Sequence, residues 1–170
     1  IVGFGKIGKC TAEKATGLVK SIVAYDPYVD EADFTERGVS CVGIEELFAQ
    51  ADIIINHMRL TDENERFFNA AAFEAMARKP LFINLGRGLC VDEGALVAAL
   101  DSGKIRAFGA DVLQDETPDL ANHPLVGRDN VIITPHAAFY STTAIEDLER
   151  LSCQNIVHFL RGEKDQVFKL

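Results

Sequence analysis

The sequence predicts an α/β fold in which helices cover both faces of a parallel sheet, the doubly wound arrangement. Short β-branched apolar runs alternate with amphipathic stretches, a glycine-rich turn follows the first run, and polar side chains follow several later ones. Such alternation is typical of parallel strands linked by crossover helices. Because 170 residues suit one domain with a sizeable core, we expect a single domain over residues 1–170.

The order of the elements follows from the apolar pattern. Each short run rich in Val, Ile and Phe is interpreted as a strand, which places strands at residues 1–4, 21–25, 40–42, 53–56, 81–84, 107–110 and 131–133. Each longer amphipathic stretch is interpreted as a helix, which places helices at 7–16, 32–37, 44–49, 63–68, 71–77, 92–102 and 142–160.

Local signals support some of these boundaries. Asp92 and Glu93 place negative charge at the start of the helix 92–102, and Gly103 fits just past its end. The apolar residues of 142–160 recur at helical spacing, so we expect that helix to pack on the core. Residues 114–128 contain two prolines and no periodicity, which predicts a long loop of the kind that often carries function.

Composition narrows the function classes. The formal net charge is −9 and no basic run is present, so we expect no nucleic-acid partner. No apolar run approaches the ~20 residues of a membrane helix, and the first residues belong to the fold rather than to a signal peptide. The four cysteines, Cys10, Cys41, Cys90 and Cys153, are scattered along the chain. We therefore expect them to be buried thiols in a reducing cytoplasm, and we expect no metal site.

The chain opens with a strand end that runs into G-x-G-x-x-G. Gly3 permits a tight turn, Gly5 lets the backbone approach a pyrophosphate, and Gly8 lets the following helix pack closely. Only two residues precede Gly3, so we expect the chain to begin inside its first strand.

The glycine turn alone does not identify the ligand, because methyltransferases carry the same turn. Asp26, however, follows the second predicted strand, where a carboxylate accepts hydrogen bonds from ribose hydroxyls and repels a 2′-phosphate. The pairing indicates a Rossmann-type dinucleotide site with NAD favoured over NADP.

Three polar residues follow later strands, at the sheet edge where α/β proteins bind ligands. Arg87 lies between two glycines, Glu116 lies in an acidic loop, and His136 follows a proline. Each has an ordinary explanation, as a solvated arginine, a surface charge or a structural histidine. Together they supply a carboxylate clamp, an acid/base and a partner carboxylate, which with nicotinamide are what oxidation of a 2-hydroxy acid requires.

These segments resemble the D-isomer-specific 2-hydroxyacid dehydrogenase family. The resemblance rests on the glycine turn with Asp26, on HMRLTDEN at 57–64, on NLGRG at 84–88, on Asp111 with Glu116, and on TPH at 134–136. It covers essentially the whole chain but only that family's nucleotide-binding domain. The family's second, substrate-side domain is absent, so we expect this chain to keep a dinucleotide groove and to lose most turnover.

The resemblance implies a role for each matching residue. Arg87 would bind the substrate carboxylate, His136 would be the general acid/base, and Glu116 would be its partner. Asp26 would hold the adenosine ribose, and Asp111 would approach the nicotinamide carboxamide. The remaining expected cofactor contacts are Lys6 and Ile7 under the pyrophosphate, Met58, Arg59 and Asn64 near adenine and ribose, and Leu85 and Gly86 near nicotinamide. The family also forms dimers through this domain, which implies a homodimer.

Two departures keep alternatives open. Arg59 stands where the family usually has proline, and its charge offers a partner for a 2′-phosphate, so NADP remains an alternative. Phe139 and Tyr140 follow His136 as in the dehydrogenase-like corepressors, so an NAD(H)-responsive interaction module without catalysis is the second hypothesis. A methyltransferase is the third, although Arg87 and His136 have no evident task in one.

Overall fold

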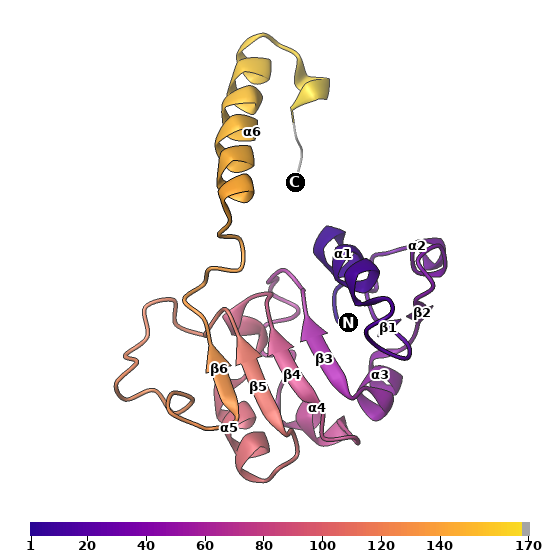
Figure 1. The fold of residues 1–170 in the computed structure, drawn as a ribbon, viewed down its shortest axis with the longest axis vertical. Helices are drawn as coiled ribbons and strands as arrows, with labels where there is room; N and C mark the ends of the chain where they lie inside the picture. The colour runs from indigo at the N-terminus through magenta and orange to yellow at the C-terminus, as the bar shows by residue number, and fades with distance from the viewer. Residues whose placement is uncertain (168–170) are drawn as a thin grey trace. The chain divides into compact units, whose positions relative to one another are not determined.

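The structure is a computed structural model that describes residues 1–167 (Figure 1). These residues form two compact units, one of Ile1–Pro135 and one that begins at His136. The expectation of a single domain over the whole chain stays a prediction.

The first unit contains a parallel sheet of four strands in the order β3-β4-β5-β6 (Figure 1). The strands are β3 (Ile53–Asn56), β4 (Leu81–Asn84), β5 (Ala107–Ala110) and β6 (Val131–Ile133), with the bounds that the apolar pattern predicts. Asn56 pairs with Asn84, and Asn84 with Ala110, so the carboxyl ends of three strands lie level. Two shorter strands, β1 (Val23–Ala24) and β2 (Ser40–Cys41), pair in parallel beside this sheet.

The predicted first strand is reduced to a link between the two sheets. Val2 alone bridges Tyr25 on one side and Asn56 on the other. The expectation of a strand over residues 1–4 is therefore wrong in extent, because the chain turns away at Gly3, whose φ is 88°. The link still places the glycine turn between the carboxyl ends of β1 and β3.

Five helices of the first unit cover its strands. They are α1 (Lys6–Ala15), α2 (Glu31–Thr35), α3 (Ile44–Gln50), α4 (Ala70–Ala75) and α5 (Glu93–Asp101), and a short 3-10 turn, η1, spans Gly88–Cys90. The Asn69 side chain caps α4, and that of Asp92 caps α5 by accepting from the Ala95 N–H. Gly103 follows α5 with a φ of 68°, as its sequence position predicts.

Two hydrophobic clusters hold these elements together. In the larger one, α3, α4 and α5 pack on β3, β4 and β5 around Phe82, whose ring centroid lies 4.7 Å from that of Phe68 and 5.5 Å from that of Phe108. In the smaller one, α1 and α2 enclose Phe4 and Phe34, whose rings stack at 4.4 Å. Phe4 belongs to the glycine turn, so this stacking helps to fix the turn.

The helix predicted at 63–68 does not form. The Asn64 side chain accepts from the Thr61 N–H at 2.8 Å and donates to the Arg59 carbonyl at 2.7 Å, which closes the segment into turns. Arg66 then takes a φ of 52°, outside the helical region. Local hydrogen bonds from an asparagine compete with helix formation, and here they prevail.

The second unit is a single long helix with a short turn. Helix α6 (Thr142–Leu160) is capped by Ser141, and η2 (Lys164–Gln166) follows it. His158 Nδ1 lies 2.6 Å from Glu163 Oε2 across the end of the helix. None of the α6 residues is buried, so the core packing expected of its apolar residues is not found within this unit. No helix among residues 1–167 is long and apolar enough to cross a bilayer.

Candidate functional site

The glycine turn needs its glycines for different physical reasons. At Gly3 φ is 88°, and an added Cβ would lie 2.8 Å from the Met58 nitrogen. At Gly8 an added Cβ would lie 2.2 Å from the Gly3 carbonyl oxygen, so the helix and the turn touch backbone to backbone. An added Cβ at Gly5 would meet nothing within 4 Å. The turn is therefore closed on its inner side and open at Gly5.

Asp26 ties the second strand to this turn. Its carboxylate accepts from the Phe4 N–H at 2.8 Å and from the Tyr28 N–H at 3.0 Å. A carboxylate has about four lone-pair positions, so two remain for the hydroxyls of a ligand. Asp26 thus both holds the turn in place and presents acceptors beside it.

A cavity of about 510 Å³ lies between the loops that follow β1 and β3. It brings together six residues that the sequence assigns to cofactor binding: Gly3, Gly5, Asp26, Met58, Arg59 and Asn64. Its other walls are Tyr25, Pro27, Tyr28, Val29, His57, Thr61, Glu63 and Phe67, none of which the sequence analysis assigns to cofactor binding. Most of them lie just past the carboxyl ends of β1 and β3, so the rule that ligands bind at those ends is the signal that finds them.

The start of α1 stands next to this cavity. Its N-cap residue is Gly5, which has no side chain to cap the first N–H groups. Lys6 and Ile7 are exposed in the first turn, and they do not line the cavity itself. The main-chain N–H groups at the start of a helix and the helix dipole attract anions. A phosphate beside Gly5 and a ribose beside Asp26 fit this chemistry, so the residues suit a dinucleotide.

His57, one of the walls of the cavity, is an uncharged side chain. Its Nε2 lies 2.9 Å from Thr11 Oγ1, and its main-chain N–H donates to the Val2 carbonyl. Burial lowers the pKa of His57, and the ammonium of Ile1 lowers it further. His57 is therefore uncharged near neutral pH and adds no cation to the site.

Two buried asparagines join the ends of β3 and β4. Asn56 donates to the Asn84 side chain at 2.9 Å, and the same Asn84 oxygen accepts from the Gly86 N–H at 3.2 Å. Asn84 in turn donates to the Arg87 carbonyl at 3.0 Å. An added Cβ at Gly86 would lie 2.5 Å from the Met58 carbonyl oxygen. The loop that carries Leu85, Gly86 and Arg87 is thus held against the edge of the cavity.

Arg87 is exposed, and its guanidinium donates to the Gly86 carbonyl at 2.8 Å. Its neighbour Gly88 packs so tightly that an added Cβ would lie 1.8 Å from the Leu113 carbonyl oxygen. Leu113 leads into the predicted long loop, which lacks helix and strand over residues 114–128. Glu116 is exposed on that loop. The segments of Arg87 and Glu116 are therefore neighbours.

One carboxylate binds the long loop at two points. Glu93, in the first turn of α5, accepts from the Gln114 N–H at 2.7 Å. Its other oxygen lies 3.4 Å from His123 Nε2, and both side chains are largely buried. Glu93 thus ties Gln114 at the start of the loop and His123 within it to α5.

The other predicted residues lie in different surroundings. Asp111 is buried past β5, where its carboxylate accepts from the Thr134 hydroxyl at 2.5 Å. His136 is exposed, has a φ of 50°, and is the first residue of the second unit. Among residues 1–167, no group of three or more His, Cys, Asp or Glu side chains is arranged to hold a metal ion.

The family comparison covers most of the chain. Residues 1–138 match the model of the D-isomer specific 2-hydroxyacid dehydrogenase, NAD binding domain. A D-lactate dehydrogenase of Leuconostoc mesenteroides subsp. cremoris is 34% identical over 179 residues, which span 98% of this chain and 54% of that enzyme. A glyoxylate reductase of Korarchaeum cryptofilum is also 34% identical, over 96% of this chain and 49% of that protein.

Solved structures agree with this match. The D-lactate dehydrogenase of Aquifex aeolicus, complexed with NAD and lactic acid, superposes with a TM-score of 0.88 at 29% identity, over 98% of this chain and 54% of that one. The chain spans about half the length of the curated relatives it matches.

Proposed function

The chain belongs to the D-isomer specific 2-hydroxyacid dehydrogenase family, whose NAD binding domain it matches, and we propose that it serves hydride transfer between NAD(H) and a 2-hydroxy or 2-oxo acid. The observation that carries the proposal is that Gly3, Gly5 and Asp26 line the same cavity. Bound NAD(H) supplies the hydride donor and acceptor. The chain's own residues bind and orient it.

In this proposal the adenosine half of the dinucleotide lies in the cavity. Asp26 accepts from the ribose hydroxyls through its two free lone-pair positions, and Met58, Arg59 and Asn64 face the adenine and ribose. The N–H groups at the start of α1, at Lys6 and Ile7, face the pyrophosphate. Leu85, Gly86 and Asp111 serve the nicotinamide end, at the carboxyl ends of β4 and β5.

The same proposal assigns the chemistry of the substrate to three side chains. Arg87 binds the substrate carboxylate, because a guanidinium matches a carboxylate with two parallel hydrogen bonds. His136 takes the hydroxyl proton when the acid is oxidised and returns it when the keto acid is reduced. Glu116 is the carboxylate partner of His136. The resemblance and the neighbouring segments of Arg87 and Glu116 support these roles.

Equilibrium binding tests the cofactor part. We expect NADH to bind this chain and to bind Gly8→Ala at least about tenfold more weakly, because the new methyl group displaces the turn. Ala49→Ser, at an exposed position of α3 outside the cavity, is the control and keeps the affinity of the parent chain. Equal NADH affinity of Gly8→Ala and the control would show that the glycine turn does not take part in NADH binding.

Cofactor choice is tested by the same titration with NADPH. The Asp26 carboxylate and a 2′-phosphate repel each other, so we expect NADPH to bind roughly tenfold more weakly than NADH. Tighter binding of NADPH would instead assign Arg59 as a phosphate partner. The corepressor-like alternative receives no support from the relatives named above, which are enzymes.

We also propose that the chain forms a homodimer. The resemblance implies it, and the exposed apolar side chains of α6 leave that helix without a buried face in its own unit. Light scattering at concentrations up to about the millimolar range should give twice the mass of the chain, and a monomer throughout would remove the proposal.

A further inference from the structure

A pair of buried side-chain amides lies where β3 and β4 end. Asn56 is fully buried and Asn84 is 1% exposed, and the two are register partners in adjacent parallel strands. Their side chains therefore share one face of the sheet, the face that also buries Ile54 and Phe82. An amide on such an apolar face costs stability unless its polar atoms are hydrogen-bonded.

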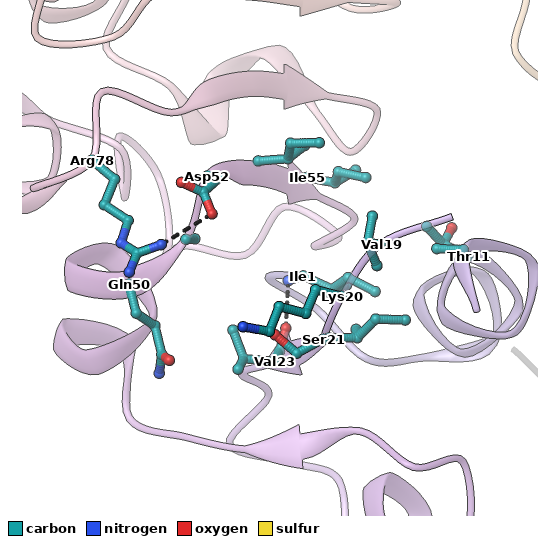
Figure 2. A pocket seen from close by; sticks show the side chains of 14 residues that line it. Ile1, Thr11, Val19, Lys20, Ser21, Val23, Gln50, Asp52, Ile55 and Arg78 are labelled. Atoms are coloured by element: carbon teal, nitrogen blue, oxygen red, sulfur yellow. Dashed lines mark hydrogen bonds and ion pairs between the residues drawn. The ribbon is translucent and has the colours of Figure 1, made fainter. Parts of the chain in front are cut away.

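The polar side chain at the other end of β3 has a different environment. Figure 2 shows Asp52, just before the strand, paired with Arg78, whose Nη1 lies 3.1 Å from Asp52 Oδ2. Both side chains are exposed, so water can replace either partner. At the carboxyl end the amides of Asn56 and Asn84 are shielded from water, so their partners must be protein groups.

Those partners fix the orientation of each amide in turn. The Met58 N–H donates to Asn56 Oδ1 at 3.0 Å, which leaves Asn56 Nδ2 to donate to Asn84 Oδ1 at 2.9 Å. The same Asn84 oxygen accepts from the Gly86 N–H at 3.2 Å. Asn84 Nδ2 then donates to the Arg87 carbonyl at 3.0 Å. If the Asn56 amide were turned over, its NH₂ group would face the Met58 N–H, donor against donor.

This series of hydrogen bonds joins two loops of the candidate site. Met58 is a wall of the cavity at the carboxyl ends of β1 and β3. At the other end of the series, Asn84 holds the main chain on both sides of the Gly86–Arg87 peptide bond. The Arg87 guanidinium bonds to the Gly86 carbonyl of that same peptide. An added Cβ at Gly86 would lie 2.8 Å from Asn56 Nδ2, so this segment also packs directly on Asn56.

We propose, on the basis of the function proposed above, that Asn56 is a positioning residue for the nicotinamide and substrate end of the site. It sets the orientation of the Asn84 amide, and Asn84 holds the loop that presents Gly86 and Arg87. Asn56 does not line the cavity itself, so it acts through Met58 and Asn84.

The thiol beside this pair is neutral. Cys90 is fully buried and interacts with the Asn56 side chain and with the main chain of Arg87. Burial raises the pKa of the Cys90 thiol, so it carries no charge near neutral pH. A neutral neighbour leaves the hydrogen-bond partners to decide how the two amides are oriented.

Two substitutions at position 56 test the proposal. Asn56→Leu has a similar size and removes both the donor and the acceptor, whereas Asn56→Asp keeps the acceptor for the Met58 N–H and replaces only the donor to Asn84. Ile54→Val is the matched control, because it removes buried volume from the same face of β3 without changing a polar atom. Each variant is titrated with NADH and with AMP, which has the adenosine half but no nicotinamide.

We expect both Asn56 variants to lose about three- to tenfold in NADH affinity relative to AMP affinity, the range for one hydrogen bond. The Gly86 amide, followed by NMR hydrogen exchange, should exchange at least about tenfold faster, while the amides of β5 keep the rates of the parent chain. Ile54→Val should keep the parent ratio of the two affinities and the parent exchange at Gly86. Asn56→Asp carries the test if Asn56→Leu does not fold.

Equal weakening of NADH and AMP would place the effect of Asn56 in the adenosine half and would overturn the proposal. So would Gly86 exchange that is as slow in the Asn56 variants as in Ile54→Val. A parent chain that binds neither NADH nor AMP would instead overturn the proposed function, and exchange at Gly86 would still decide whether Asn56 holds the loop.

Discussion

When the chain is prepared with Ile1 as its first residue, the buried ammonium of Ile1 makes the free energy of unfolding depend on pH in a calculable way. Its pKa falls from 8.0 to about 5 because burial penalises the charge. At one pKa unit per 1.36 kcal/mol, a shift of three units makes the protonated nitrogen cost the folded state about 4 kcal/mol. Acetylating that nitrogen removes the charge and leaves an N–H that still donates to the Val23 carbonyl.

The sign follows from proton binding. Between pH 5 and pH 8 the unfolded chain binds the proton and the folded chain releases it, so the free energy of unfolding rises with pH across this window. The penalty is complete below pH 5 and absent above pH 8. Acetylation should therefore raise the free energy of unfolding by about 3 kcal/mol more at pH 6 than at pH 9.

Urea unfolding of both forms at pH 6 and pH 9 measures this gap. The chain is prepared with Ile1 as its first residue, and the acetylated form is the matched control because all carboxylates and histidines are shared. The pKa of His57 should also rise on acetylation, since the ammonium is one of the causes that lower it. A gap that is equal at the two pH values would refute the reasoning.

Substitutions at three further positions test the packing, a helix cap and the turn. Phe82→Ala, in the fully buried centre of the large cluster, should lower the free energy of unfolding by about 3–5 kcal/mol in urea titrations, and a loss below about 1 kcal/mol would contradict the assigned core. Asn69→Ala removes the cap of α4 and should cost about 1 kcal/mol, whereas Asn69→Asp should retain most of it; equal losses would show that the cap contributes nothing. Gly8→Ala, which weakens NADH binding as described above, should also cost about 1–3 kcal/mol by the same assay, and unchanged stability would mean that Gly3 moves aside freely.

The parts of the fold that the sequence predicts well are those decided by local pattern. The bounds of β3, β4, β5 and β6 follow from apolar runs flanked by turn residues, and α6 follows from its helical spacing. The segment 63–68 fails because a single side chain, Asn64, competes for the backbone, and periodicity does not register that competition. The strand at 1–4 is reduced to Val2 because the chain turns away at Gly3.

The residues of the candidate site also fall into those that the sequence predicts and those that it does not. Gly3, Gly5 and Asp26 are predictable because the motif encodes backbone geometry at fixed spacing, and the structure places them on one cavity. Walls such as Tyr28 and Phe67 were not predicted, because they come from loops whose course depends on contacts far away in the sequence. The catalytic roles of Arg87, Glu116 and His136 remain predictions.

With the role proposed for Asp26, its two hydrogen bonds to the main chain limit how the coenzyme preference of this domain can be re-engineered. Replacing the carboxylate with a small neutral residue, to admit a phosphorylated coenzyme, also leaves the main-chain N–H groups of Phe4 and Tyr28 without their acceptor. A successful redesign would need a second mutation that supplies new acceptors to both donors. Libraries that vary position 26 alone should therefore yield weak binders of either coenzyme more often than converted ones.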